Sequence, residues 1–164
     1  MHTKFTLTRR QLLVGTAHTA LAASAITEAA AATDVLPRVT VTRDPNCGCC
    51  IAWVEHMRAS GFPVDVVEID DVVPLKVKLG VPEALMSCHT SQVGSYVVEG
   101  HVPADAVKRL LAERPDATGI AVAGMPIGSP GMEIKGEAPR PYEVVIFSND
   151  RQNVFARFRG TRQT

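Results

Sequence analysis

Four cysteines and one histidine carry the most distinctive chemistry in this sequence. Three of the cysteines stand together as Cys47, Cys49 and Cys50, and the fourth is followed directly by a histidine, as Cys88 and His89. Thiolate sulfur binds soft metal ions and also takes part in thiol–disulfide exchange. The spacing of these residues is therefore the observation that decides between metal binding and disulfide chemistry.

Two structural disulfides are the ordinary explanation for four cysteines in an oxidising compartment. A bridge between the adjacent residues Cys49 and Cys50 would be strained, because disulfide geometry does not suit neighbours in the chain. A domain of this size also has enough core to fold without such bridges. A disulfide between Cys47 and Cys50 that leaves Cys49 as a spare buried cysteine stays open as an alternative.

The cysteine cluster is expected at the start of a helix. Unpaired backbone N–H groups at that end favour thiolates, and residues three apart on a helix share one face, so Cys47 and Cys50 can converge. Cys49 must then point away from Cys50, and one ion could hardly take all three sulfurs. Two or more ions bridged by thiolates could.

Thiolate-rich sites select Cu(I), zinc or iron–sulfur clusters. Zinc favours four ligands around one ion, commonly as two C-x-x-C pairs, and the second pair is missing here. Four thiolates would neutralise four Cu(I) ions, and only Arg43 lies close by in sequence to offset their charge. Charge counting therefore favours copper, as more than one Cu(I) ion, with zinc and then an iron–sulfur cluster as the alternatives. Met125 and Met132, in a glycine–proline loop, are further candidate ligands, with ordinary packing as the alternative.

Other side chains near these motifs are expected to be structural. Trp53 should pack under the cluster and Met57 in the core, while His56 should lie on the exposed helix face. His101 is expected at the surface, on a hairpin turn.

The elements that must position these residues follow from the apolar patterns. Strands are expected where β-branched and aromatic residues gather, at 39–42, 64–69, 96–98, 142–147 and 154–158. The second of these is apolar on both faces, which is typical of an internal strand in a parallel pair. Residues 101–102 should form a short returning strand, and residues 119–136 a loop.

Helices are expected between these strands. The first should begin with Asn46 as N-cap and end at Ser60, the second should run from Asp71 to Leu79, and the third should open at Pro103. This α/β order, with a cysteine motif between the first strand and helix, predicts a thioredoxin-like fold with an added C-terminal β-hairpin. A generic α/β sandwich is the alternative.

The N-terminal segment predicts export. Arg9 and Arg10 precede an uncharged run and an alanine tract that ends at Ala32. This pattern is typical of a signal peptide, and the paired arginines resemble a twin-arginine signal. We expect a signal peptide over 1–32, a metal-binding domain over 33–164 and a periplasmic location; an uncleaved anchor helix would need a polar face that this segment lacks.

Composition excludes several classes of function. The chain has 17 basic and 17 acidic residues with no basic run, which argues against nucleic-acid binding. No later apolar stretch is long enough to span a membrane. A hydrophobic fraction of 46% indicates a globular domain rather than a disordered one.

Five sequence blocks, in order, resemble the CopG-type family of periplasmic copper-resistance proteins, long listed as a domain of unknown function. These blocks are 47–54, 79–82, 87–90, 100–103 and 124–132, within a match from Val39 to Phe158. The resemblance implies a thioredoxin-like domain that binds several copper ions and has a redox role in copper detoxification. It implies Cys47, Cys49, Cys50, Cys88 and His89 as ligands.

Three functions stay open at this point. The first is copper binding for resistance, by sequestration or by Cu(I)/Cu(II) conversion, which leaves a copper oxidoreductase activity open. The second is dithiol–disulfide exchange on proteins; it is weakened because thioredoxins place a cis-proline before the third strand, and this chain has no proline between Pro82 and Pro103. The third is copper transfer to other periplasmic copper-handling proteins.

Overall fold

The computed structural model describes His2 and residues 35–164. The expected signal peptide, apart from His2, lies outside the described residues. The described part has helices α1 (Gly48–Ala59), α2 (Val73–Lys78), α3 (Ala104–Glu113) and the 3₁₀ helix η1 (Glu83–Leu85). Its strands are β1 (Val39–Arg43), β2 (Val64–Glu68), β3 (His89–Val93), β4 (Tyr96–Glu99), β5 (Gly119–Ala121), β6 (Pro141–Ser148), β7 (Arg151–Arg159) and β8 (Arg162–Gln163). None of its helices combines the length and apolar character that a membrane crossing requires.

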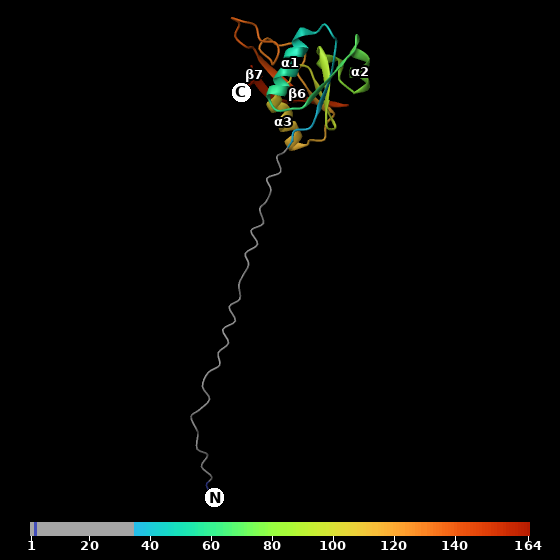
Figure 1. The fold of residues 1–164 in the computed structure, drawn as a ribbon. Helices are drawn as coiled ribbons and strands as arrows, with labels where there is room; N and C mark the ends of the chain where they lie inside the picture. The colour runs from blue at the N-terminus through green and yellow to red at the C-terminus, as the bar shows by residue number, and fades with distance from the viewer. Residues whose placement is uncertain (1, 3–34) are drawn as a thin grey trace, which may run out of the picture. The chain divides into compact units, whose positions relative to one another are not determined.

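The strands form one mixed sheet in the order β2-β1-β3-β4-β5-β6-β7-β8. The β1–β2 and β4–β5 pairs are parallel and the other pairs are antiparallel. The predicted α/β class is therefore confirmed. The long β6–β7 hairpin, which turns at 149–150, confirms the expected C-terminal hairpin (Figure 1).

Two apolar cores lie on opposite faces of this sheet. Val98 of β4 packs in the core that also contains side chains of α1 and α3, whereas its neighbour Val97 packs with Val81 and Leu85. Successive strand residues point to opposite faces, so α1 and α3 cover one face and the α2–η1 segment covers the other. Figure 1 shows α1 and α2 on opposite sides of the strands.

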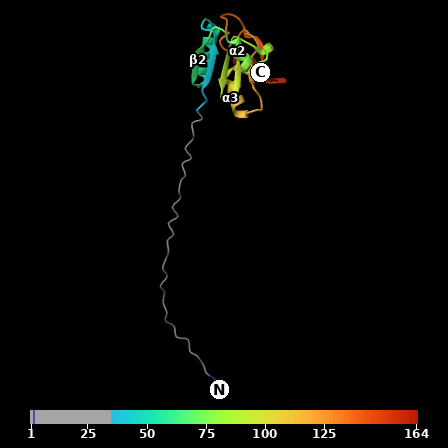
Figure 2. The same ribbon diagram turned by 90° about the vertical axis from the view of Figure 1, so that its right-hand side faces the viewer.

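Strand β2 differs from the prediction for residues 64–69. It pairs in parallel with β1, as expected, but it is the edge strand and most of its residues are exposed, as Figure 2 shows at the side of the domain. Its apolar residues Val66 and Val67 are 36% and 44% exposed. Apolar composition alone cannot tell an internal strand from an edge strand.

The segments around β3, β5 and His101 also differ from expectation. Strand β4 pairs with the preceding strand β3, in a hairpin that turns at Gly94, and not with a strand that follows it. Residues 101–102 are not in a strand, so the predicted returning strand is wrong. Residues 119–121 form β5 inside the expected loop. A Cβ at Gly119 would lie 2.0 Å from the carbonyl oxygen of Val97, so glycine allows the close approach of β5 to β4.

Candidate metal centre

The cysteine motif follows a turn that Arg43 holds at the end of β1. Its guanidinium donates to the carbonyl oxygens of Asp44 and Pro45, at 2.9 and 3.1 Å, and pairs with Glu68. The predicted cap at Asn46 is wrong: Cys47 is the N-cap of α1, and its side chain makes no capping hydrogen bond. The Arg43 guanidinium is thus engaged by the turn and by Glu68.

The four cysteine sulfurs gather at the start of α1. Cys47 and Cys50 form a disulfide, and Cys49 and Cys88 are free. The Cys49 Sγ lies 3.5 Å from that of Cys47 and 3.7 Å from that of Cys88. All four Sγ atoms lie within 4.8 Å of one another.

This arrangement overturns the expectation that one ion could not reach Cys47, Cys49 and Cys50 together. Cys47 has an extended backbone, with φ −77° and ψ 95°, so its side chain is outside the helical register and can approach Cys49. Thiolates that share a tetrahedral ion at typical bond lengths have sulfurs about 3.8 Å apart. The donor set therefore fits thiolate-bound metal once the disulfide is reduced.

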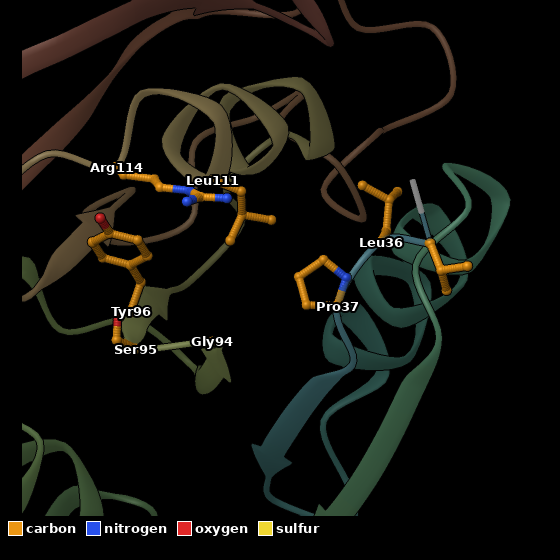
Figure 3. A pocket seen from close by; sticks show the side chains of 8 residues that line it. Leu36, Pro37, Gly94, Ser95, Tyr96, Leu111 and Arg114 are labelled. Atoms are coloured by element: carbon orange, nitrogen blue, oxygen red, sulfur yellow. The ribbon is translucent and has the colours of Figure 1, made fainter. Parts of the chain in front are cut away.

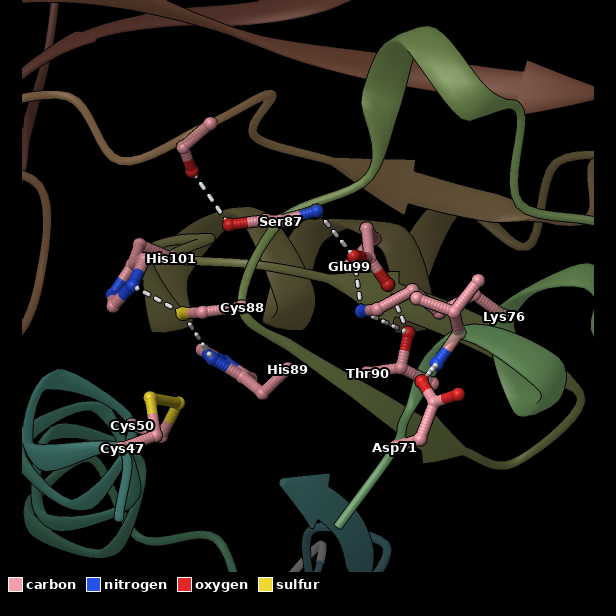
Figure 4. Close-up of polar contacts among 12 residues, drawn as sticks. Cys47, Cys50, Asp71, Lys76, Ser87, Cys88, His89, Thr90, Glu99 and His101 are labelled. Carbon is pink, nitrogen blue, oxygen red and sulfur yellow. Dashed lines mark hydrogen bonds and ion pairs between the residues drawn. A yellow bond between two sulfur atoms is a disulfide. The ribbon is translucent and has the colours of Figure 1, made fainter. Parts of the chain in front are cut away.

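Cys88 lies between two imidazoles, as Figure 4 shows. Its Sγ is 3.4 Å from Nδ1 of His89 and 3.0 Å from Nε2 of His101. His101 is fully buried, so its predicted surface position is wrong. Its Nδ1 donates to the carbonyl oxygen of Pro130 at 2.8 Å, which turns Nε2 toward the sulfur.

Burial keeps this second group uncharged. Burial, and then the neighbouring Cys49 sulfur, raises the pKa of Cys88 to about 12. Burial lowers the pKa of His89 well below its usual value, with smaller contributions from His101 and Lys76, and it lowers the pKa of His101 as well. Both imidazoles are therefore neutral at pH 7, the form in which histidine binds metals.

A buried ion pair supports the segment that carries Cys88. Glu99, at the end of β4, accepts from Lys76 Nζ of α2 and from the backbone N–H of Ser87, each at 2.6 Å, and also from the Thr90 hydroxyl. Glu99 is fully buried, and the Lys76 side chain is only 3% exposed. The pair thus fixes the residues on both sides of Cys88 and His89.

Helix α1 supports the same site from the other face of the sheet. Trp53 is buried as expected, and its ring lies 4.6 Å from that of His89, between centroids. Its indole N–H donates to the carbonyl oxygen of Val102 at 2.9 Å. Met57 lies in the core as predicted, whereas His56 is partly buried and accepts from the Ala104 N–H at 3.0 Å, in place of the exposed position expected.

The glycine- and proline-rich segment 124–132, here called the methionine loop, packs against α1. Its two methionines differ in exposure. A Cβ at Gly131 would lie 2.7 Å from the carbonyl oxygen of Cys49 and 2.8 Å from the backbone nitrogen of Trp53, both in α1. Met125 is 52% exposed and Met132 is partly buried. The loop therefore reaches the cysteine motif through its backbone.

A surface hollow of about 390 Å³ lies elsewhere on the domain (Figure 3). Its lining includes Leu36, Tyr96 and Leu111 and no cysteine or histidine. Tyr96 begins β4, whereas Glu99 ends it next to the metal-binding side chains. The hollow and the candidate centre thus lie at opposite ends of this strand.

Two solved structures are similar to this chain. One, described as "Copper resistance protein copG- Form 1", is 42% identical, has a TM-score of 0.70 and is aligned over 76% of this chain and 99% of its own. The chain belongs to the CopG family. The other, "Copper resistance protein copG- Form 2", is also 42% identical, with a TM-score of 0.70 and coverage of 75% and 98%.

Part of the chain also matches a protein family. The family described as "Protein of unknown function, DUF411" matches residues 85–132. This range contains Cys88, His89 and His101 but not the cysteine cluster that begins at Cys47. No curated protein matches the chain.

His101 is a buried neighbour of Cys88 that the sequence pattern did not reveal. The block Gly100–Pro103 is one of those that resemble the family, and this resemblance could have indicated a role for His101. The turn-like pattern around His101 instead predicted a surface position. The structure brings Cys47, Cys49, Cys50 and Cys88 together and places His89 against Cys88.

Proposed function

We propose that this chain is a periplasmic copper-binding protein that holds several Cu(I) ions in a cysteine-bridged cluster and contributes to copper resistance. The observation that carries the proposal is the group of four sulfur atoms within 4.8 Å of one another, in a chain 42% identical to copper resistance proteins. Soft thiolates bind Cu(I) well, and their charge balances that of the ions.

The proposed ligands are Cys47, Cys49, Cys50 and Cys88, with His89 beside them. Reduction of the disulfide would free two further thiolates next to Cys49. Thiolate sulfur can bridge two ions, so four clustered sulfurs can hold more than one Cu(I). Met125 and Met132 are proposed as outer ligands from the loop that packs on α1.

Sequestration and redox conversion are both compatible with this donor set. In a conversion step, the thiols of Cys47 and Cys50 would give one electron to each of two Cu(II) ions. The products would be two Cu(I) ions, the disulfide and two protons. The remaining thiols would then hold part of the Cu(I) formed.

The finer statements on fold and export are also proposals. The β1–α1–β2 unit, with a cysteine motif at the start of α1, supports a thioredoxin-like domain. The arginine pair and the alanine tract before Ala32 support export to the periplasm by the twin-arginine route. Other periplasmic copper-handling proteins are proposed as partners in copper transfer.

Copper stoichiometry tests the proposal. The reduced protein is titrated anaerobically with Cu(I) against a chromophoric chelator, beside the Cys49→Ser variant. More than one tightly held copper per chain, with fewer in the variant, is the expected result. One zinc ion per chain, or no metal at all, would contradict it. Unchanged affinity in a Met125→Leu, Met132→Leu double variant would remove the methionines from the site.

Dithiol–disulfide exchange on proteins is the second candidate function. The disulfide between Cys47 and Cys50, with the free Cys49 sulfur 3.5 Å from Cys47, is the observation that favours it. An insulin-reduction assay with the metal-free protein separates the two functions. Robust turnover without copper binding would favour this candidate over the copper cluster.

A further inference from the structure

The outer edge of β2 is open for strand pairing. This strand is the last on its side of the sheet, and no strand of the described residues lies beyond it (Figure 2). We propose that this edge joins two copies of the chain into a dimer, in which β2 pairs antiparallel with β2 of the second copy about a two-fold axis at Val66. The inference concerns assembly and does not depend on the proposed copper function.

The backbone of β2 directs its unpaired groups outward at every second residue. Pro63 accepts from β1 through its carbonyl oxygen at 2.9 Å, and the Ile69 N–H donates to β1 at 3.1 Å. Successive residues of a strand direct their N–H and C=O groups to opposite sides, so the odd-numbered residues from 63 to 69 face β1. The backbone groups of Val64, Val66 and Glu68 therefore face a second strand.

Strand β2 lacks the features that commonly protect an edge strand from pairing. Such edges carry lysine, proline or a β-bulge, whereas Val64–Glu68 contains neither residue and keeps an unbroken register with β1. Its two carboxylates already have partners within the chain: Asp65 pairs with Arg38 at 2.8 Å, and Glu68 pairs with Arg43. Neither unpaired charge nor irregular geometry thus keeps a second strand away.

Charge and strand length favour one register. With the axis at Val66, all five residues of β2 pair, and Val66 and Val64 exchange hydrogen bonds with outward-facing residues of the second copy. An axis at Asp65 would set two like charges directly opposite each other, which is destabilising. An axis at Val67 would pair only residues 66–68 of the strand.

Arg58 supplies a complementary charge for this register. From α1 it donates to the Val64 carbonyl oxygen at 3.4 Å, and its side chain is 46% exposed. Val64 would lie opposite Glu68 of the second copy. Glu68 lines a hollow of about 190 Å³ together with side chains of α1, so its carboxylate lies on the α1 face of the sheet. Arg58 of each copy can therefore pair with Glu68 of the other, twice in the symmetric dimer.

Apolar contacts at the same edge are few. Val66 and Ile51 line this hollow and are 36% and 47% exposed, so the axis would cover both. The contact is nevertheless limited to two edge strands and the adjoining rim of α1. Interfaces below about 1,200 Å² are typical of weak complexes, and we expect a dimer that forms in a concentration-dependent way.

Hydrogen exchange on the wild-type, metal-free chain tests the inference. Sedimentation velocity first measures its mass from about 10 μM to 1 mM, a range that corresponds to weak association, and mass spectrometry without reductant excludes disulfide-linked dimers. We expect dimer to form as the concentration rises. Exchange of the Val64, Val66 and Glu68 amides should slow severalfold in step, whereas the Asp65 amide, which faces β1, should not change.

Two lysine variants locate the contact. Val66→Lys would set two ammonium groups against each other at the axis, and the dimer should weaken by at least about tenfold. Val154→Lys is the matched control, because Val154 is 43% exposed in β7, at the other end of the sheet, and it should leave the dimer unchanged.

Several results would overturn the inference. These are a monomer at every concentration, species larger than a dimer, a dimer in which the three outward-facing amides exchange as in the monomer, or a Val66→Lys dimer as tight as that of the wild type. Slow exchange of these amides in the monomer would also refute it, since the chain would then cover its own edge. The wild-type measurements give the answer even if Val66→Lys fails to fold. All of them use the metal-free chain, so their failure leaves the copper proposal untouched.

Discussion

The substitution Glu99→Gln should destabilise the domain and weaken copper binding together. The carboxylate is fully buried and accepts from Lys76 and from the Ser87 N–H, each at 2.6 Å. Glutamine keeps the shape and one acceptor oxygen but leaves the Lys76 ammonium buried without a charge partner. Breaking a buried pair in this way costs about 3–5 kcal/mol, and the retained acceptor places the loss near 3.

The melting temperature gives the first readout. For a domain of this size, such a loss lowers the melting temperature by roughly 10 °C. Glu113→Gln is the matched control, because Glu113 makes an equally short ion pair with Arg109 in which both side chains are well exposed. The control should change stability by less than about 0.5 kcal/mol.

Copper affinity gives the second readout. Ser87 precedes Cys88, and in the variant its backbone N–H would bond to an uncharged, weaker acceptor beside the unpaired Lys76 ammonium. The weaker anchor should loosen Cys88 and reduce Cu(I) affinity by about 10- to 100-fold, as for other supporting contacts at metal sites. Chelator competition on the reduced protein measures this change. A Glu99→Gln protein as stable as the Glu113→Gln control would refute the argument from the buried pair.

Three further predictions concern the packing and redox state of the site. Gly131→Ala should lower stability by about 1–3 kcal/mol and reduce copper loading, because Gly131 has φ +85° and a Cβ there would meet the Cys49 carbonyl oxygen at 2.7 Å. Gly136→Ala, at φ +88° with open space around it, should cost less in the same thermal melts; equal losses would contradict the clash. Trp53→Phe should cost about 1–3 kcal/mol in chemical denaturation, since it leaves the buried Val102 carbonyl without its donor, and a loss below about 0.5 would count against this role. Alkylation of the denatured metal-free protein should add two groups per chain before reduction and four after it, by mass; four before reduction would show that the disulfide is absent.

The parts of the fold with strong local patterns could be predicted from the sequence. The β6–β7 hairpin and the start of α1 at the cysteine motif follow from apolar runs and turn residues close together in the chain. Strand β3 was not predicted, because His89–Val93 is mostly polar and becomes a strand only between β1 and β4. The edge position of β2 depends in the same way on which strands pair.

In the candidate site, too, the residues that are adjacent in the sequence could be predicted, and those brought in by contacts between distant segments could not. Cys47 to Cys50 and Cys88–His89 are visible as adjacent residues with metal-binding chemistry. His101 reaches Cys88 only because the chain bends after β4 and Pro130 holds the ring, and both contacts join segments far apart in sequence. The sulfur geometry also depended on the extended backbone of Cys47, which helical spacing could not reveal.

The most direct test of a cysteine-bridged copper cluster is X-ray absorption at the copper edge on the reduced, Cu(I)-loaded protein. The proposal predicts a first shell dominated by sulfur together with a copper–copper scattering path, which only bridged ions at short separation produce. Sulfur ligation without any copper–copper path would indicate isolated ions. A first shell of nitrogen and oxygen would contradict the cluster outright.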